Sequence, residues 1–399
     1  MLDYTLFGES HGPVVGVLME NLPAGLPVEE AFIARQLLRR RGQGALTTAR
    51  QEADTVEYLS GVFQGKTTGD PLVAVIRNSD VRSEDYETLK NTPRPGHADY
   101  AAWIKANGFN DYRGGGHHSG RLTAPLVVAG SLAQTYLREK GITVSAEVAE
   151  ELLRAQAAAA RAEGDSVGGQ IRCTVRGLPA GLGGFGWKEA VDSEIARQVF
   201  AIPAVKAVGF GEGEGFARMR GSEANDALQT DGQQITMTSN HAGGINGGIT
   251  NGMPIAFTVT FRPTPSIAGE QQTVDIKTNT NTTIAIRGRH DACIALRAAP
   301  AVEAATALAV MRMLPPEDTL AGYRAELDGI DRELVELFAR RMDVAGAIGA
   351  YKKAHGLPVR DEVREAEVLR SRGDLWPEHR RQVEQLFRLL MEYSREEQQ

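Results

Sequence analysis

The chain changes character at residues 313–318, where the sequence reads Met-Leu-Pro-Pro-Glu-Asp. Two consecutive prolines end a helix, and Asp318 or Thr319 is suited to cap the next one. Charged residues make up 32 of the 83 positions from 317 to 399, but only 63 of the first 316. A chain of 399 residues is also long for one domain. We therefore predict a first domain at 1–313, a linker at 314–319 and a second domain at 320–399.

Composition excludes several classes of protein. The chain carries 44 basic and 51 acidic residues, a net charge of -7. This balance argues against a protein that binds nucleic acid or an anionic membrane. Its two cysteines, Cys173 and Cys293, are too few for a disulfide framework, and we expect no metal site. The opening MLDYTLFGESHG lacks the pattern of a signal peptide, and no apolar run approaches the roughly 20 residues that a bilayer requires. We expect a soluble cytoplasmic protein.

Strand-like and helix-like segments are mixed in the first domain. Runs at 71–76, 170–175 and 255–260 are apolar, short and bounded by glycine or proline, which predicts strands. Helices are predicted at 28–41, 121–140 and 147–163. Because strands come both singly and in adjacent pairs, the pattern favours an α+β layered domain over an alternating parallel one.

Three local patterns resemble known motifs and fail on inspection. Residues 60–67 resemble a phosphate-binding loop, but serine stands at position 60, where that geometry needs glycine, and a strand follows. The glycines at 209–215 do not satisfy G-x-G-x-x-G in any frame, so a nicotinamide-type dinucleotide fold has no support. The adjacent His117 and His118 diverge on either a strand or a helix, which does not favour a shared metal.

Histidine and glycine occur together throughout the first domain. Six of the eight histidines lie there, and each has a glycine within three positions. Glycine lets the backbone approach a ligand, and histidine moves protons near neutral pH, so the pattern predicts a ligand pocket. Arginines recur beside these turns and are suited to carboxylate and phosphate groups. The triplet at 39–41, taken alone, favours a solvated helix end.

Eight ordered motifs resemble the chorismate synthase family over residues 1–313. They are GESHG, RRR followed by TTAR, SGVFQGKTTG, RPGHADY, RGGGHHSGRLTA, GLPAGLG, SNHAGGINGG and GRHDACIALRAAPAVEA. The resemblance implies a β-α-β sandwich, a homotetramer and a bound reduced FMN that is not consumed overall. It also implies a lyase that converts 5-enolpyruvylshikimate 3-phosphate to chorismate by 1,4-elimination of phosphate. A flavin reductase is a candidate partner.

The resemblance assigns roles residue by residue. His11 resembles the acid that protonates the leaving phosphate, His97 the acid near flavin N1, and Asp291 the carboxylate that assists proton removal at flavin N5. The anion clamp corresponds to Arg41, Arg50, Arg94, Arg121 and Arg289. The cofactor contacts correspond to Ser119, Asn240, Gly243, Gly244, Arg262 and Ser266. The sequence also departs from the family pattern: His117-His118-Ser119-Gly120-Arg121-Leu122-Thr123 stands where RSSARET is common, Arg262 replaces lysine, and Ala292 replaces proline.

The second domain begins with a long amphipathic pattern. From Leu320 to Tyr351, apolar residues recur at three-four spacing, which predicts one helix of about 35 residues. Arg341 interrupts the apolar stripe, and Lys352 returns to the same face eleven residues later. Two shorter helices are predicted near 361–372 and 377–397. Three helices with one long apolar face do not close a good core, so we expect pairing with a second copy. Periodicity alone leaves a coiled-coil dimerisation module equally open.

A second set of ordered residues spans the helical part: Leu320-Ala-Gly-Tyr-Arg324, Ile330-Asp331-x-x-Leu334, Ala339-Arg-Arg341, Lys352, Pro358-Val-Arg-Asp361-x-x-Arg364-Glu365, Leu386-Phe387, Ser394 and Gln398. With this set, residues 318–398 resemble the all-helical chorismate mutase. The resemblance implies that Arg324 from a partner subunit, Arg341 and Arg364 bind carboxylates, and that Lys352 and Gln398 stabilise the ether oxygen. It further implies that the pocket is completed by Asp361, Glu365 and Ser394. The two resemblances together predict an enzyme that makes chorismate and rearranges it to prephenate. Two alternatives stay open: a non-catalytic sensor or dimerisation module at the C-terminus, and a flavin oxidoreductase with net redox chemistry.

Overall fold

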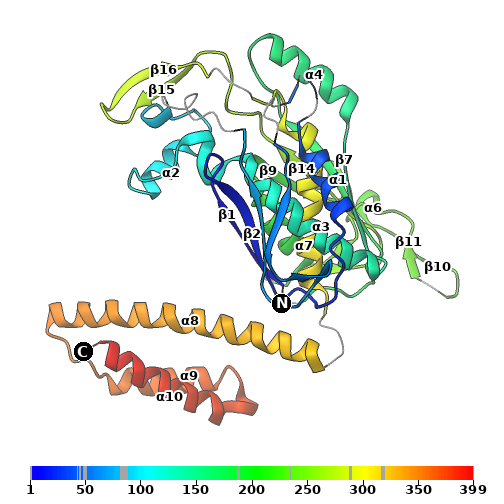
Figure 1. The fold of residues 1–399 in the computed structure, drawn as a ribbon. Helices are drawn as coiled ribbons and strands as arrows, with labels where there is room; N and C mark the ends of the chain where they lie inside the picture. Colours follow the sequence, from blue (N-terminus) through cyan, green and yellow to red (C-terminus); the bar gives the residue numbers. More distant parts are fainter. Residues whose placement is uncertain are drawn as a thin grey trace. The chain divides into compact units, whose positions relative to one another are not determined.

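The computed structural model describes residues 2–398 except 43, 45, 48–51, 81–88, 185, 187–188, 234, 287–289 and 316–319. It divides into two compact units, Leu2–Pro315 and Pro316–Gln399, which we call the first unit and the helical unit. The division falls inside the predicted linker. Each unit is described separately below (Figure 1).

The first unit contains two four-stranded antiparallel sheets. One has the order β1-β2-β6-β3 and is built from Asp3–Gly8, Val14–Glu20, Leu72–Arg77 and Val56–Ser60. The other has the order β7-β8-β14-β9 and is built from Thr143–Val148, Gly169–Arg176, Ile255–Phe261 and Val205–Phe210. Strand β14 alternates buried and half-buried residues along its length, as expected when one face of a sheet covers a core. The predicted strands at 71–76, 170–175 and 255–260 are confirmed.

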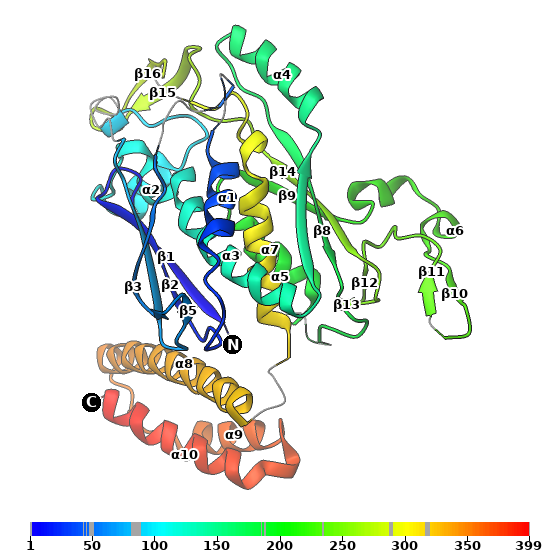
Figure 2. The ribbon, with the colours of Figure 1, turned by 45° about the vertical axis from the view of Figure 1, so that its right-hand side comes forward.

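Helices fill the space between these sheets (Figure 2). The inner helices are α1 (Glu30–Arg40), α3 (Thr123–Glu139), α5 (Val191–Phe200) and α7 (Ala299–Met313). Helices α3 and α7 are buried along almost their whole length, which explains why both read as nearly continuous apolar sequence. They pack closely at Gly130, because a Cβ atom there would lie 2.2 Å from the Ala304 backbone. The structure therefore confirms the predicted α+β layered fold.

Smaller elements surround the layers. The outer helices are α2 (Asp99–Lys105), α4 (Glu150–Ala162) and α6 (Gly221–Ala224). The two-stranded hairpins are β4–β5 (Val62–Phe63, Lys66–Thr67), β10–β11 (Leu228–Thr230, Ile235–Met237), β12–β13 (Ile245–Asn246, Ile249–Thr250) and β15–β16 (Gln271–Asp275, Thr280–Ile284). Short 3-10 turns cover Arg113–His118, Gly120–Leu122, Gly213–Arg218 and Ile294–Arg297. Several of these turns and loops line the cavity described below.

The helical unit contains α8 (Leu320–His355), α9 (Glu362–Gly373) and α10 (Arg380–Glu397), with a 3-10 turn at Pro377–His379. Both the 36-residue first helix and the two shorter ones are thus confirmed. Asp361 caps α9 by accepting a hydrogen bond from the Arg364 backbone N–H at 2.9 Å. Across the part of the chain that is described, no helix combines the length and apolarity needed to cross a membrane.

Candidate active sites

A cavity of about 580 Å³ opens in the first unit. This volume lies within the roughly 300–1,000 Å³ typical of small-molecule sites. Its walls come from seven separate segments: the β1–β2 loop, the end of α1 with the loop after it, the loop before α2, the turns leading into α3, residues 198–206, residues 262–266 and residues 290–297. Loops from both sheets and from the helix layer therefore meet at one place.

Histidines gather around this cavity. Five of the six histidines of the first unit line it, namely His11, His97, His117, His118 and His290. The sixth, His241, is not among the lining residues, although its glycine-rich surroundings look the same in sequence. His241 instead lies with its Nδ1 3.0 Å from the carboxylate of Asp226. A glycine neighbour therefore does not by itself distinguish a cavity histidine from a structural one.

A glycine triplet shapes the space occupied by the two predicted acids. Gly114, Gly115 and Gly116 all have positive φ, which favours glycine over other residues. A Cβ on Gly114 would lie 2.5 Å from the His11 ring, and one on Gly115 would lie 2.9 Å from the His97 ring. Both imidazoles thus pack directly on glycine backbone, which explains why the sequence has glycine at these positions.

Arg40 is a cationic cavity residue to which the sequence analysis gave no role. It is buried, and its Nη2 donates to Asp54 Oδ2 at 2.9 Å. Burial lowers the pKa of Arg40 to about 10, which still leaves it charged at neutral pH. The prediction of a solvated helix end is wrong for this residue. Its helical spacing from the buried Ile33 and Leu37 was the available signal, because the three lie on one face of α1.

Arg121 shares the carboxylate of Asp54 with Arg40. Its Nη1 donates to Asp54 Oδ1, and its Nε donates to Asn78 Oδ1 at 2.9 Å. Burial by itself would raise the pKa of Asp54, but the charges of Arg40 and Arg121 hold that pKa below its usual range. The buried Nη2 of Arg121 has no hydrogen-bond partner among the described residues, and Arg121 lines the cavity. An unsatisfied guanidinium donor of this kind is suited to an anionic ligand.

Two more predicted clamp residues also line the cavity, Arg41 and Arg94. Arg41 donates from Nη2 to the carbonyl oxygen of Ala53 at 2.9 Å. Arg94 is buried and donates from Nη1 to Ser266 Oγ at 3.1 Å. The remaining two, Arg50 and Arg289, lie outside the described residues.

Asp291 is a cavity residue held by a neighbouring arginine. Arg297 donates from Nε and Nη2 to the two carboxylate oxygens of Asp291, each at 2.8 Å. Burial would lower the pKa of Arg297, but the charge and hydrogen bonds of Asp291 raise it overall. The pair is six residues apart, and Arg297 belongs to the motif GRHDACIALRAAPAVEA, although the sequence analysis gave it no role. This geometry fixes the orientation of the carboxylate.

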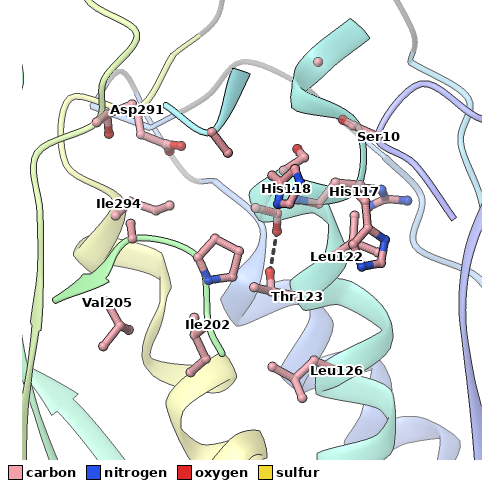
Figure 3. A pocket seen from close by; sticks show the side chains of 18 of the residues that line it. Ser10, His117, His118, Leu122, Thr123, Leu126, Ile202, Val205, Asp291 and Ile294 are labelled. Atoms are coloured by element: carbon pink, nitrogen blue, oxygen red, sulfur yellow. Dashed lines mark hydrogen bonds between the residues drawn. The ribbon is translucent and has the colours of Figure 1, made fainter. Parts of the chain in front are cut away.

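The cavity has one apolar side and one polar side (Figure 3). Leu126, Ile202 and Val205 lie together on the apolar side and Ser10, His118 and Asp291 lie on the polar side, while Ile294 is next to Asp291 and Leu122 is next to His117. His117 and His118 are in edge-to-face contact with ring centroids 6.2 Å apart. Burial lowers the pKa of His118, and the neighbouring His117 lowers it further.

The predicted cofactor contacts fall into two groups. Ser119, Arg262 and Ser266 line the cavity. Asn240, Gly243 and Gly244 do not; Asn240 donates from Nδ2 to the Pro254 carbonyl at 2.8 Å, and the two glycines pack on backbone of residues 211 and 254. A cofactor role for the second group stays a prediction.

A second polar cluster lies between α8 and α10 of the helical unit. Arg341 donates from Nη1 to the Leu390 carbonyl at 2.7 Å and to Ser394 Oγ. Burial lowers the pKa of Arg341. Gln398 lies against Gly349, where a Cβ would be 2.7 Å from the Gln398 Cα, and no described residue donates to its buried Oε1. The structure thus brings three of the predicted mutase residues to one pair of helices.

The other predicted residues of this unit lie on α8 and at the start of α9. Lys352 donates from Nζ to the Val359 carbonyl at 2.6 Å, and Arg364 pairs with Glu367 at 2.5 Å. Glu365 accepts from Arg395 at 2.7 Å, a partner that the sequence analysis did not single out. Arg324 is exposed on α8, and its contribution to a partner's site stays a prediction.

Fold and cavity together define an enzyme that acts on small anionic molecules, because acids, bases and cations converge on one cavity that also has apolar walls. The family model for chorismate synthase matches residues 2–153 and 147–314, and the model for chorismate mutase type II matches residues 323–399. The chorismate synthase of Thermococcus kodakarensis is 45% identical over 338 residues, covering 78% of this chain and 95% of that relative. The chorismate synthase of Aeropyrum pernix is 45% identical over 345 residues, covering 78% and 90%.

A solved structure gives the same result. The crystal structure of a chorismate synthase matches with a TM-score of 0.61 and 25% identity, covering 83% of this chain and 98% of that one. The chain belongs to the chorismate synthase family and carries a chorismate mutase type II domain at its C-terminus. Both resemblances stated from the sequence are confirmed.

Proposed function

We propose that this chain catalyses two consecutive reactions. In the first unit, 5-enolpyruvylshikimate 3-phosphate loses phosphate by 1,4-elimination to give chorismate, with reduced FMN bound. In the helical unit, chorismate undergoes a Claisen rearrangement to prephenate. The observation that carries the first reaction is the convergence of His11, His97, Arg94, Arg121 and Asp291 on one cavity from segments far apart in the chain.

The cavity fits a flavin in its chemistry. Its apolar side chains suit a flat ring system, and Arg121 Nη2, which has no hydrogen-bond partner among the described residues, supports the binding of an anionic group in the same cavity. Ser119, Arg262 and Ser266 are the lining residues that would hold the cofactor. When bound, reduced FMN supplies an electron-rich ring that allows the carbon–oxygen and carbon–hydrogen bonds to break without net oxidation.

Side chains of the cavity bind the substrate and move protons. Arg94 and Arg121 bind the carboxylates and phosphate of the substrate, since guanidinium groups pair with both. His11 donates a proton to the departing phosphate, which otherwise leaves as a poorly stabilised anion. Asp291, held in orientation by Arg297, accepts a proton. The apolar side chains exclude water and strengthen these electrostatic interactions.

The second reaction needs only positioning and charge. A Claisen rearrangement transfers no proton and forms no bond to the enzyme. Arg341, anchored on Ser394, holds a substrate carboxylate, while Lys352 and Gln398 stabilise negative charge at the breaking ether bond. Cations without a nucleophile suit this task.

We further propose that the helical unit pairs with a second copy and that the first unit assembles as a tetramer. The apolar stripe of α8 supports the pairing, because its members Leu327, Ile330, Leu334, Leu337 and Ile348 are 44–60% exposed. Apolar surface of this extent is usually covered by a partner. Sedimentation of the full chain tests both parts.

The decisive experiment supplies 5-enolpyruvylshikimate 3-phosphate and reduced FMN to the full chain without oxygen and identifies the product. Prephenate is expected from the native chain, and chorismate from Arg341→Ala. Arg388→Ala, an exposed arginine on α10, serves as the matched control and should still give prephenate. Prephenate formation by Arg341→Ala at the native rate would contradict the assignment of the mutase site.

A further inference from the structure

Asp99 is a buried carboxylate beside the cavity to which neither resemblance assigned a role. It is the first residue of α2, and its side chain is 8% exposed. Four donors reach its two oxygens: the Arg94 backbone N–H (3.1 Å) and Nε (2.7 Å) at Oδ2, and Arg94 Nη2 (2.8 Å) and His97 Nδ1 (2.5 Å) at Oδ1. Every acceptor site of an ionised carboxylate is therefore in use.

These contacts keep Asp99 ionised. Burial alone would raise the pKa of the Asp99 carboxyl, but the hydrogen bonds and charges of Arg94 and His97 hold that pKa well below its usual range. The Asp99 carboxylate therefore accepts hydrogen bonds throughout the physiological pH range and holds its donors, Arg94 and His97, in one orientation.

The contact with Asp99 determines which nitrogen of His97 is available. Because the carboxylate of Asp99 can only accept, Nδ1 donates to Asp99 Oδ1, and Nε2 is the ring nitrogen through which His97 can exchange a proton with a ligand; Nε2 itself lies 3.4 Å from Arg94 Nη2. The opposite side of the ring packs on Gly115, whose ideal Cβ position lies 2.9 Å from Cε1 and 3.1 Å from Nε2. The ring is thus held between a carboxylate and a glycine backbone.

The same carboxylate orients Arg94. With Nε and Nη2 paired to Asp99, Nη1 points to Ser266 Oγ at 3.1 Å. Arg94 Nη2 also lies 3.1 Å from His97 Nδ1, so a guanidinium and an imidazole stand side by side with one carboxylate between them. The negative charge offsets the repulsion that two adjacent cations would create.

We propose that Asp99 is a positioning residue for the elimination: it fixes the orientation of the His97 ring and of the Arg94 guanidinium group together. The inference rests on the proposed role of His97 as a proton donor in the first unit. Asp99 itself is not a catalytic residue, because all of its acceptor sites are taken by this chain. The geometry is that of a carboxylate holding an imidazole in one orientation through Nδ1, so that a proton donated by the protonated ring leaves from Nε2.

The matched control is Glu303, another buried carboxylate that pairs with an arginine. Its oxygens accept from Arg39 Nη1 at 2.6 Å and Nη2 at 3.0 Å, and its side chain is 4% exposed. Glu303 does not line the cavity. Glu303→Gln therefore measures what the loss of a buried carboxylate does to the fold alone.

The test compares Asp99→Asn, Asp99→Glu and Glu303→Gln in the full chain. The first readout needs no cofactor: diethyl pyrocarbonate labelling of His97 is measured by mass spectrometry relative to His118 in the same cavity. We expect the ratio to rise several-fold in both Asp99 variants, since the ring is released, and to stay unchanged in Glu303→Gln. The second readout is chorismate formation, where kcat should fall about 10- to 100-fold in the Asp99 variants only.

Asp99→Glu keeps the negative charge and moves it by one methylene, so it remains informative if Asp99→Asn does not fold. A folded Asp99 variant with both the labelling ratio and kcat within two-fold of the native chain would overturn the proposal. If the native chain forms no chorismate, the proposed function fails, while the labelling ratio still decides the role of Asp99.

Discussion

The glycine pair at 114–115 allows the two proposed acids to be perturbed separately. Gly114→Ala places a Cβ 2.5 Å from His11 Cδ2 and 2.7 Å from His11 Nε2, whereas Gly115→Ala places one against His97. Ordinary contacts of a Cβ atom begin at about 3.4 Å, so the His11 ring must move by about 0.9 Å. A displacement of about 1 Å at a reacting group costs on the order of 100-fold in rate.

Backbone strain has to be separated from this displacement. Gly114 has a φ of 59°, and an alanine in the left-handed region costs roughly 1–2 kcal/mol. Gly65 provides the control, because its φ is 74° and a Cβ there would meet nothing within 4 Å. Gly65→Ala should lower the melting temperature by a similar few degrees and leave kcat/KM unchanged.

The assay measures phosphate release and chorismate formation with reduced FMN under anaerobic conditions. Gly114→Ala is expected to reduce kcat/KM about 100-fold while remaining folded. If Gly114→Ala keeps a third or more of the native kcat/KM, or loses no more than Gly65→Ala, then the glycine does not determine where His11 lies and the reasoning is refuted.

Three further outcomes follow from the structure. Arg341→Ala should abolish the rearrangement and leave the elimination intact, as a separate assay of each reaction shows; equal loss of both would contradict two independent sites. Gly349→Ala should displace Gln398, since the new Cβ would lie 2.7 Å from its Cα, and should lower mutase kcat at unchanged phosphate release. The pKa of Asp54 is lower in the folded chain than its unfolded value of 3.8. Ionised Asp54 therefore adds to the free energy of unfolding above pH 3.8, and this contribution is lost as the pH falls through the folded pKa. Asp54→Asn should therefore cost about 3–5 kcal/mol in unfolding experiments at pH 7 and reduce the loss of stability towards pH 3; an unchanged acid transition would argue against this ion pair.

Local patterns in the sequence predict helices, strands and family, whereas contacts between distant residues are visible only in the structure. The helices and strands were predictable because their signals are local: the apolar spacing of α8 and the alternation of β14 extend over consecutive residues. The family was predictable because its motifs occur in order. The triplet at 39–41 illustrates the limit, since helical spacing can place Arg40 on the buried face of α1 but cannot show that it pairs with Asp54.

The sequence alone determined the two units, the helices and strands with the clearest periodicity and the families to which the units belong, because periodicity, proline punctuation and ordered motifs need no distant contacts. The tertiary structure decided which charged groups act together. Asp54 meets Arg121 across 67 positions and Arg94 meets Ser266 across 172, whereas His241 lies away from the cavity despite its similar surroundings in sequence. Such pairings depend on where the sheets and helices bring the chain, because electrostatic interactions act through distance in space and not along the sequence.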